Sequence, residues 1–348
     1  MSLLRAFRWP LALSAAALLA TWWWLGPETA LLVAILAVLE ISLSFDNAVV
    51  NAKVLGRMSR RWQSLFLTLG IAIAVFGMRL VFPLLIVSLA GHLGPVEVLR
   101  LAMNAPDQYA AILTQAHPAI AAFGGTFLLM LFLDFVFEDR EIKWLRRLEW
   151  ALAKLGRLEN LTVIVTLVVL ATAALGLSAD NPAVVLWPGI LGMVTYLVLT
   201  SLTGLFQISR VAGSRALKGQ TAQAIARAGL LSFIYLEVLD ASFSFDGVIG
   251  AFAITNQIFL IALGLGIGAL FVRSMTVYFV RRRILARYIY LEHGAHYAVG
   301  VLALILLITI RYDVPEPVTG LIGIGFIAIA FLDSREYRRQ HTEAVHQL

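Results

Sequence analysis

Residues 40–47 read Glu40-Ile-Ser-Leu-Ser-Phe-Asp46-Asn47, and residues 240–247 read Asp240-Ala-Ser-Phe-Ser-Phe-Asp246-Gly247. The two octapeptides align without gaps and share the pattern S-x-S-F-D. Each also carries an acidic residue two positions before its first serine. Acidic side chains are costly in apolar surroundings, so a motif of this kind that occurs twice indicates a duplicated functional element.

A second match follows each motif copy in the same order. Gly70 precedes Arg79 by nine residues, and Gly264 precedes Arg273 by nine residues. Chance similarity between apolar segments rarely preserves two matches in the same order. The pattern therefore predicts that the chain consists of two related halves.

Composition places these halves in a membrane. The chain has 348 residues, of which 60% are apolar and only 14% are charged, with a mean hydropathy of +0.87. A soluble protein of this length cannot cover its surface with so few charges, so the bilayer must be the main solvent. The absence of cysteine excludes thiolate metal sites and disulfides.

Ten intervals are predominantly apolar and are predicted to cross a hydrocarbon core, for which about 17–25 residues suffice, although the ninth is short. They are residues 9–25, 29–51, 64–90, 118–137, 160–177, 183–206, 229–254, 257–280, 296–310 and 318–332. Of the 27 Lys and Arg residues, 23 fall in alternate loops and at the two termini. This alternation is typical of ten spans with both termini in the cytoplasm. The net charge of +6 is thereby explained without nucleic-acid binding.

We therefore expect an all-α, polytopic bundle in a single domain covering residues 1–348. The predicted topology makes the two motif copies run in opposite directions, so the halves, about 9–137 and 183–310/332, are expected to be inverted repeats of five helices. Many secondary transporters use this plan. The charged stretch 138–159 is expected to be an amphipathic helix on the cytoplasmic surface.

Six carboxylates fall within the predicted spans. They are Glu40, Asp46, Asp134, Glu237, Asp240 and Asp246. An ionised Asp at mid-helix costs about 2.5–3.5 kcal/mol on insertion scales, so each needs a counter-ion or a polar interior. Only Arg79 and Arg273 lie in the spans, so we expect at least four acids to lack a basic partner and to face a bound cation. The two arginines are expected to neutralise Asp134 or a motif acid when metal is absent.

Helical spacing adds a geometric expectation. Six residues separate Glu40 from Asp46, which is roughly 240° around a regular helix, so the two cannot share a face. Because Asn47 and Gly247 tolerate a left-handed backbone, we expect each helix to break near its F-D-(N/G) step, at the membrane midplane. Ser44 and Ser244 are either supporting groups or bond only to the preceding turn. Asn51 is expected to be a cap.

The motif copies offer carboxylate, amide and hydroxyl oxygens. Such hard ligands suit Mn²⁺, with Ca²⁺ or Mg²⁺ as alternatives, better than Zn²⁺ or Cu⁺. The predicted metal ligands are Glu40, Asp46, Asn47, Glu237, Asp240 and Asp246. Carboxylates crowded at low dielectric raise one another's pKa, which makes proton exchange for metal a natural coupling. No nucleophile–base pair or nucleotide loop occurs, so an enzyme is not expected.

The stretches Glu40 to Val50 and Glu237 to Thr255 resemble the paired signatures of the TerC family of integral membrane proteins, within the LysE-type transporter superfamily. Downstream, Gly264 to Arg273 and Tyr290-Leu-Glu-His-Gly-Ala-His-Tyr297 resemble its later segments, and the likeness covers roughly residues 30–335. It implies export of manganese, and of calcium, from the cytoplasm across the plasma (inner) membrane of a prokaryote. The long stretch 138–159 and Gly247, where the family pattern has Ser, suggest a divergent subgroup.

Two other functions fit the same residues. The chain could be the membrane scaffold subunit of a tellurite- or metal-stress complex in which the acids hold a structural ion, with protein partners that the sequence does not identify. An intramembrane aspartyl protease would need two carboxylates sharing a proton. Four clustered acids are too many for a simple dyad, and the G-x-G-D step is missing.

Overall fold

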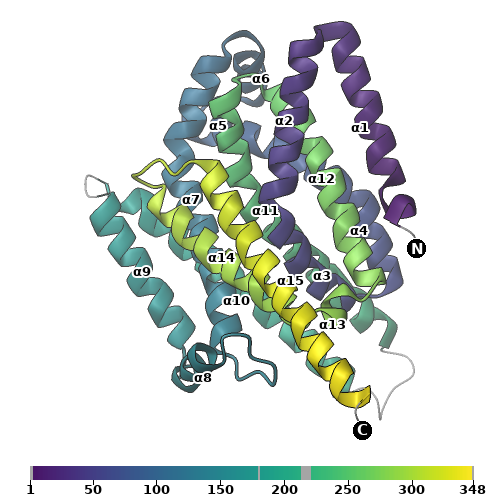
Figure 1. Ribbon diagram of the computed structural model, residues 1–348. Coiled ribbons are helices and arrows are strands. Elements are labelled where there is room, and N and C mark those ends of the chain that lie inside the picture. The colour runs from purple at the N-terminus through teal and green to yellow at the C-terminus, as the bar shows by residue number, and fades with distance from the viewer. Residues whose placement is uncertain (1–2, 179–180, 213–220, 347–348) are drawn as a thin grey trace.

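In a computed structural model of the chain, every regular element is helical among the described residues, which are 3–178, 181–212 and 221–346. Within those ranges the side chains of 3–5, 203–212, 221–228, 245, 246, 249, 253, 316, 317 and 341–346 are outside the description. The elements are α1 Leu3–Leu25, α2 Pro27–Leu43, α3 Phe45–Gly56, α4 Arg60–Ala72, the π-helix η1 Ile73–Val81, α5 Phe82–Gly91, α6 Pro95–Asn104, α7 Pro106–Phe137, α8 Arg146–Leu155, α9 Leu161–Leu177, α10 Ala183–Ala212, α11 Thr221–Ile254, α12 Ile258–Arg281, α13 Ile284–Arg287, α14 Leu291–Ile308 and α15 Glu316–His346 (Figure 1).

A helix, or a bent run of helices, occupies each of the ten intervals that the sequence predicts as spans. Six helices of the described chain are long and apolar enough to cross a membrane, or seven if the bent pair α2–α3 is one span. The chain is thus a helical membrane protein. The fourth interval is longer than predicted, because α7 begins at Pro106 and continues through Pro118.

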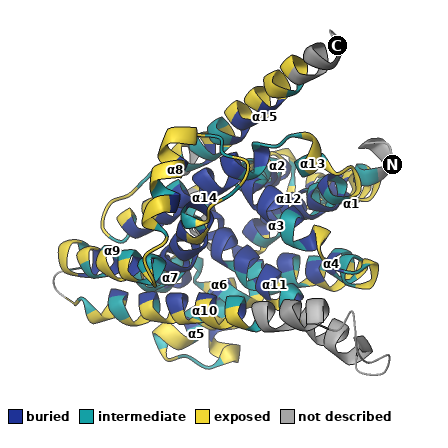
Figure 2. Ribbon diagram, turned by 90° about the horizontal axis from the view of Figure 1, so that it is seen from below, coloured by how far each residue is buried: buried dark blue, intermediate teal, exposed yellow. Residues whose placement is uncertain are grey.

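Two packed groups of helices form the bundle. In one, α7 packs against α9, α10, α11 and α14; in the other, α12 packs against α1, α2, α3 and η1. Buried residues concentrate on α3, α7, α12 and α14, whereas α9 has few buried residues and the outer part of α15 carries mostly exposed residues (Figure 2). The core is therefore made by helices from both halves of the sequence.

Basic residues from separate described segments meet at one end of the bundle. Lys53 near the end of α3 and Arg140 after α7 both form ion pairs with Glu292 at the start of α14. At the other end, Asn256 in the α11–α12 turn donates a hydrogen bond to Asp107 at the start of α7. Hence α3 runs toward the basic end and α11 runs away from it, and α8, α13 and the last turns of α15 lie low in Figure 1.

The first motif copy breaks its helix, as predicted. Helices α2 and α3 meet at an angle of 54°, and Ser44 between them has φ −99° and ψ 17°. The expected cause is wrong, however, because Asn47 is helical and not left-handed. The break lies before Phe45 instead, where the Ser44 amide still donates to the Glu40 carbonyl and the Ala48 amide donates to the Ser44 carbonyl.

The second copy does not break its helix, so that prediction is wrong. The backbone of α11 stays helical from Thr221 to Ile254, through the whole motif. Gly247 does not form a turn. It lets α11 approach Glu40 of α2 closely, because a Cβ at this position would lie 3.2 Å from Oε2 of Glu40. A π-helical turn in η1 distorts the third interval as well. It precedes Pro83, which has no amide to donate to the Arg79 carbonyl.

The predicted surface helix at 138–159 is shorter in the structure. Only Arg146–Leu155 is helical, and residues 138–145 form an irregular segment. The helix α8 exposes Leu148 and Trp150 and buries Glu149. Glu149 accepts hydrogen bonds from the amides of Trp144 and Leu145, so the irregular segment is tied to the helix that follows it.

Close glycine packing between α2 and α12 gives a stability test. A Cβ at Gly268 would lie 2.5 Å from Cβ of Glu40 and 3.0 Å from the Ala37 carbonyl oxygen. Overpacking of this kind costs about 1–3 kcal/mol, so Gly268→Leu should lower the thermal midpoint in detergent by several degrees. The control is Gly176→Ala in α9, where a Cβ meets nothing within 4 Å. Equal midpoints for the two variants would contradict this packing.

Candidate functional site

The helix break places three residues of the first motif copy beside one another. The Ser44 hydroxyl donates a hydrogen bond of 2.9 Å to Oε1 of Glu40. The backbone amide of Asn47 donates a hydrogen bond of 2.9 Å to Oδ1 of Asp46, in place of the bond to the Leu43 carbonyl that a regular helix would have. All three polar side chains, Glu40, Ser44 and Asp46, are buried.

Glu40 forms a buried ion pair with Arg79 of η1. The guanidinium contacts Oε1 of Glu40 and also donates to the Ala74 carbonyl one turn earlier. Both side chains are 2% exposed. Each residue of such a buried pair requires the other, because removal of either one would leave an uncompensated charge in the bundle interior.

The second half contains a larger pair. Arg273 of α12 donates to both carboxylate oxygens of Glu237, each at 3.0 Å, and to Oδ2 of Asp240 at 2.8 Å. Its guanidinium also stacks 4.0 Å from the centroid of the Phe66 ring. Gly70 makes room for this group, since a Cβ there would lie 2.9 Å from the guanidinium.

The two pairs involve residues that align in the two sequence matches. Glu40 aligns with Asp240, Arg79 aligns with Arg273, and each acid binds the arginine of its own half. The prediction that at least four acids lack a basic partner is wrong, because Arg79 pairs with Glu40 and Arg273 pairs with both Glu237 and Asp240. Among the acids whose side chains are described, Asp46 and Asp134 are the predicted-span carboxylates without a salt bridge.

Asn47 connects the two motif copies directly. Its side-chain amide donates to Oδ1 of Asp240 at 2.6 Å, from α3 to α11. Its Oδ1 atom is buried and has no partner in the described chain. The predicted ligand Asn47 is therefore at the junction of the two halves, with a carbonyl oxygen that remains available.

A small enclosed cavity of about 20 Å³ lies at the helix break. A water molecule needs about 10–15 Å³ by the same kind of measure, so the cavity has room for one water or one ion. Its polar walls are Glu40, Ser44, Asp46 and Thr319. The second motif copy contributes Phe243 and Gly247, and α14 and α15 complete the enclosure.

Thr319 and Gly323 of α15 were not predicted as site residues. A Cβ at Gly323 would lie 3.9 Å from Oδ2 of Asp46, so α15 approaches that carboxylate closely. Neither residue belongs to a motif copy. Only a T-x-x-x-G spacing inside an apolar helix could have indicated them, and that spacing is common in helix packing.

Further buried polar atoms continue from the cavity along α3 and α11. Both polar atoms of the Asn51 side chain and the Ser244 hydroxyl have no partner in the described chain. Asn51 is therefore not the expected cap; it lies inside α3, one turn beyond Asn47 on the same face. Unsatisfied buried groups cost about 1–3 kcal/mol each, so they indicate bound water or a polar ligand.

Two predicted residues lie elsewhere or outside the description. Asp134 accepts hydrogen bonds from Thr162 of α9 at 2.8 Å and from Tyr196 of α10 at 2.7 Å, and its side chain is exposed. It is neither with the motif acids nor neutralised by an arginine of the spans, contrary to expectation. The side chain of Asp246 lies outside the described residues. Within the described part, no group of three or more His, Cys, Asp and Glu residues could hold a metal ion.

Replacement of Arg273 tests whether the ion pairs hold the bundle together. Arg273→Met leaves Glu237 and Asp240 without a counter-charge, which should cost about 3–5 kcal/mol of stability. Adding Glu237→Gln and Asp240→Asn should restore much of it. Unfolding in detergent measures both effects, with exposed Arg100→Met as the control. A single variant as stable as wild type would exclude the structural role of the pair.

Comparison with known proteins bears on most of this region. A search of curated proteins and a search of solved structures each found no match to the chain. One family model, described as a protein of unknown function (DUF475), matches residues 45–341. That range contains Asp46, the second motif copy and the cavity-lining residues of α14 and α15, whereas Glu40, Leu43 and Ser44 precede it. The chain belongs to the DUF475 family.

Proposed function

We propose that this protein is a divalent-cation transporter that exports Mn²⁺ from the cytoplasm. The observation that carries the proposal is the enclosed cavity at the helix break. There, Asp46, which has no salt bridge in the described chain, meets Glu40 and Ser44 beside the second motif copy. A buried carboxylate without a counter-ion is expensive, and a cation supplies the missing charge.

The charges around the cavity support a divalent ion. When ionised, the carboxylates of Glu40, Asp46, Glu237 and Asp240 carry two more charges than Arg79 and Arg273 neutralise. One divalent cation balances that difference. Asp246 adds one more carboxylate to the second motif copy. A proton bound at the site, and exchanged when the metal binds or leaves, would neutralise this additional negative charge.

The donor atoms favour manganese and leave calcium and magnesium as competitors. The cavity offers carboxylate and hydroxyl oxygens, and the amide oxygen of Asn47 lies beside the second motif copy. The cavity is too small for a fully hydrated ion, so the ion would bind with its water largely removed. Mg²⁺ loses water reluctantly, which favours Mn²⁺ or Ca²⁺.

The proposed architecture is a ten-span inverted repeat with both termini in the cytoplasm, which permits alternating access to a central site. It is supported by the opposite directions of α3 and α11, by the basic segments at one end, and by the matching pairs Glu40–Arg79 and Asp240–Arg273. The resemblance to the TerC family points the same way. In the transport cycle the two halves rock about the central site, which opens first to the cytoplasm and then outward.

Transport assays test the site. In everted membrane vesicles or proteoliposomes, Asp46→Asn and Asp246→Asn should each reduce Mn²⁺ transport to background, because each removes a charged ligand. The matched control is Asp134→Asn, which removes an acid bonded to α9 and α10 and should retain most of the wild-type rate. Unchanged thermal midpoints would show that the variants fold. Normal Mn²⁺ transport by both motif variants would show that the assignment of the site to Asp46 and Asp246 is wrong.

A scaffold subunit with a structural ion is the second candidate. Its support is that Glu40, Glu237 and Asp240 are already engaged by arginines, as in a permanently assembled bundle. It predicts tight Mn²⁺ binding with no flux in liposomes and recovery of a fixed partner by native pull-down. The transporter predicts flux from the purified protein alone, so the liposome assay separates the two.

A further inference from the structure

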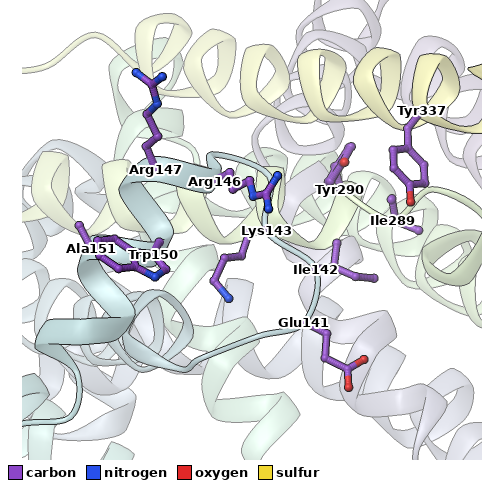
Figure 3. A pocket seen from close by; sticks show the side chains of 10 residues that line it. All are labelled: Glu141, Ile142, Lys143, Arg146, Arg147, Trp150, Ala151, Ile289, Tyr290 and Tyr337. Carbon is purple, nitrogen blue, oxygen red and sulfur yellow. The ribbon is translucent and has the colours of Figure 1, made fainter.

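A second, larger cavity of about 1000 Å³ lies at the basic end of the bundle, away from the motif acids. The segment before α8, α8 itself, the turn before α14, and α15 enclose it (Figure 3). Its lining combines Lys143, Arg146 and Arg147 with the aromatic rings of Trp150, Tyr290 and Tyr337. None of these residues takes part in the proposed cation site.

The positive charge in this cavity is largely uncompensated. Lys143 is paired with Asp139 at 2.8 Å, but Arg146 and Arg147 form no hydrogen bond or salt bridge within the described chain. Glu141 is the one acidic residue of the lining, and in Figure 3 its carboxylate points away from the Arg146 guanidinium. Two free guanidinium groups beside a cavity favour a phosphate, which arginine binds through paired N–H donors.

The position of α8 indicates where that phosphate comes from. Trp150 is 61% exposed and Leu148 is 47% exposed, although both are large and apolar. The helix α8 follows α7 and precedes α9, so it lies where apolar helices end. Exposed Trp and Leu beside basic residues are typical of a helix embedded in the bilayer interface.

We propose that this cavity binds the phosphate headgroup of an anionic phospholipid. Arg146 and Arg147 contact the phosphate, and the tyrosine hydroxyl groups of Tyr290 and Tyr337 face the polar part of the headgroup. The acyl chains leave along the exposed apolar surface of α8. Basic pockets between membrane helices bind anionic headgroups on this physical basis.

Lipid binding to the purified protein tests the proposal. Wild-type protein in neutral detergent should retain phosphatidylglycerol over phosphatidylcholine in native mass spectrometry and melt several degrees higher with it. Arg146→Gln with Arg147→Gln should weaken phosphatidylglycerol binding roughly thirty-fold, about fivefold for each arginine near an anionic surface. Both residues are exposed, so the double variant should fold normally.

The control removes the same charge from the opposite end of α8. Lys154→Gln with Arg157→Gln deletes two cations outside the cavity lining and should keep the preference for phosphatidylglycerol. Equal loss in both double variants would reduce the effect to general surface charge and overturn the assignment. Stabilisation by inorganic phosphate alone, with none added by phosphatidylglycerol, would identify a soluble phosphate ligand and overturn the lipid.

Discussion

The neutralisation of carboxylates inside an apolar bundle is the constraint on which this structure depends. Arg79 and Arg273 lie within the membrane helices and are 2% exposed, and each contacts acids of its own half. An arginine at such depth is tolerated only beside a negative charge. The positions of η1 and α12 relative to α2 and α11 follow from this requirement, and the glycines at 70 and 268 provide the space that the side chains need.

The two motif copies place their acidic side chains by different backbone conformations. The first bends its helix at Ser44, so that Glu40 and Asp46 reach one cavity despite their helical spacing. The second keeps a regular helix and brings Asp240 to Asn47 by a hydrogen bond between the copies. This asymmetry gives one broken and one continuous helix at the centre. The broken one presents Asp46 without a salt bridge in the described chain, which is why we propose the first copy as the side that binds the ion.

Much of the architecture could be predicted from sequence. A helix or a bent run of helices lies at each interval that hydropathy predicts. Helical spacing predicts the break in the first copy, but it also predicts a break in the second copy, which α11 does not have. Sequence predicts the acids at 40, 237 and 240 as site residues, but the prediction that at least four acids lack a basic partner is wrong, because one guanidinium can bind two carboxylates. Pairing of this kind depends on three-dimensional distance, which a count of charges does not contain.

Other features could not be predicted, for reasons of geometry. The role of Gly247 depends on how closely α2 approaches α11, and that distance follows only from the packed bundle. Thr319 and Gly323 reach the cavity from a helix nearly three hundred residues away in sequence. Asp134 looked equivalent to the motif acids because it lies in a span, but it lies on the face of α7 that meets α9 and α10.

The most direct test of the central claim is anomalous scattering at the manganese edge from crystals of the protein soaked in Mn²⁺. The account predicts one strong peak in the cavity at the α2–α3 break, within bonding distance of Asp46, and its loss in Asp46→Asn crystals. Anomalous density absent from this cavity, or present only at surface acids such as Asp134, would contradict it.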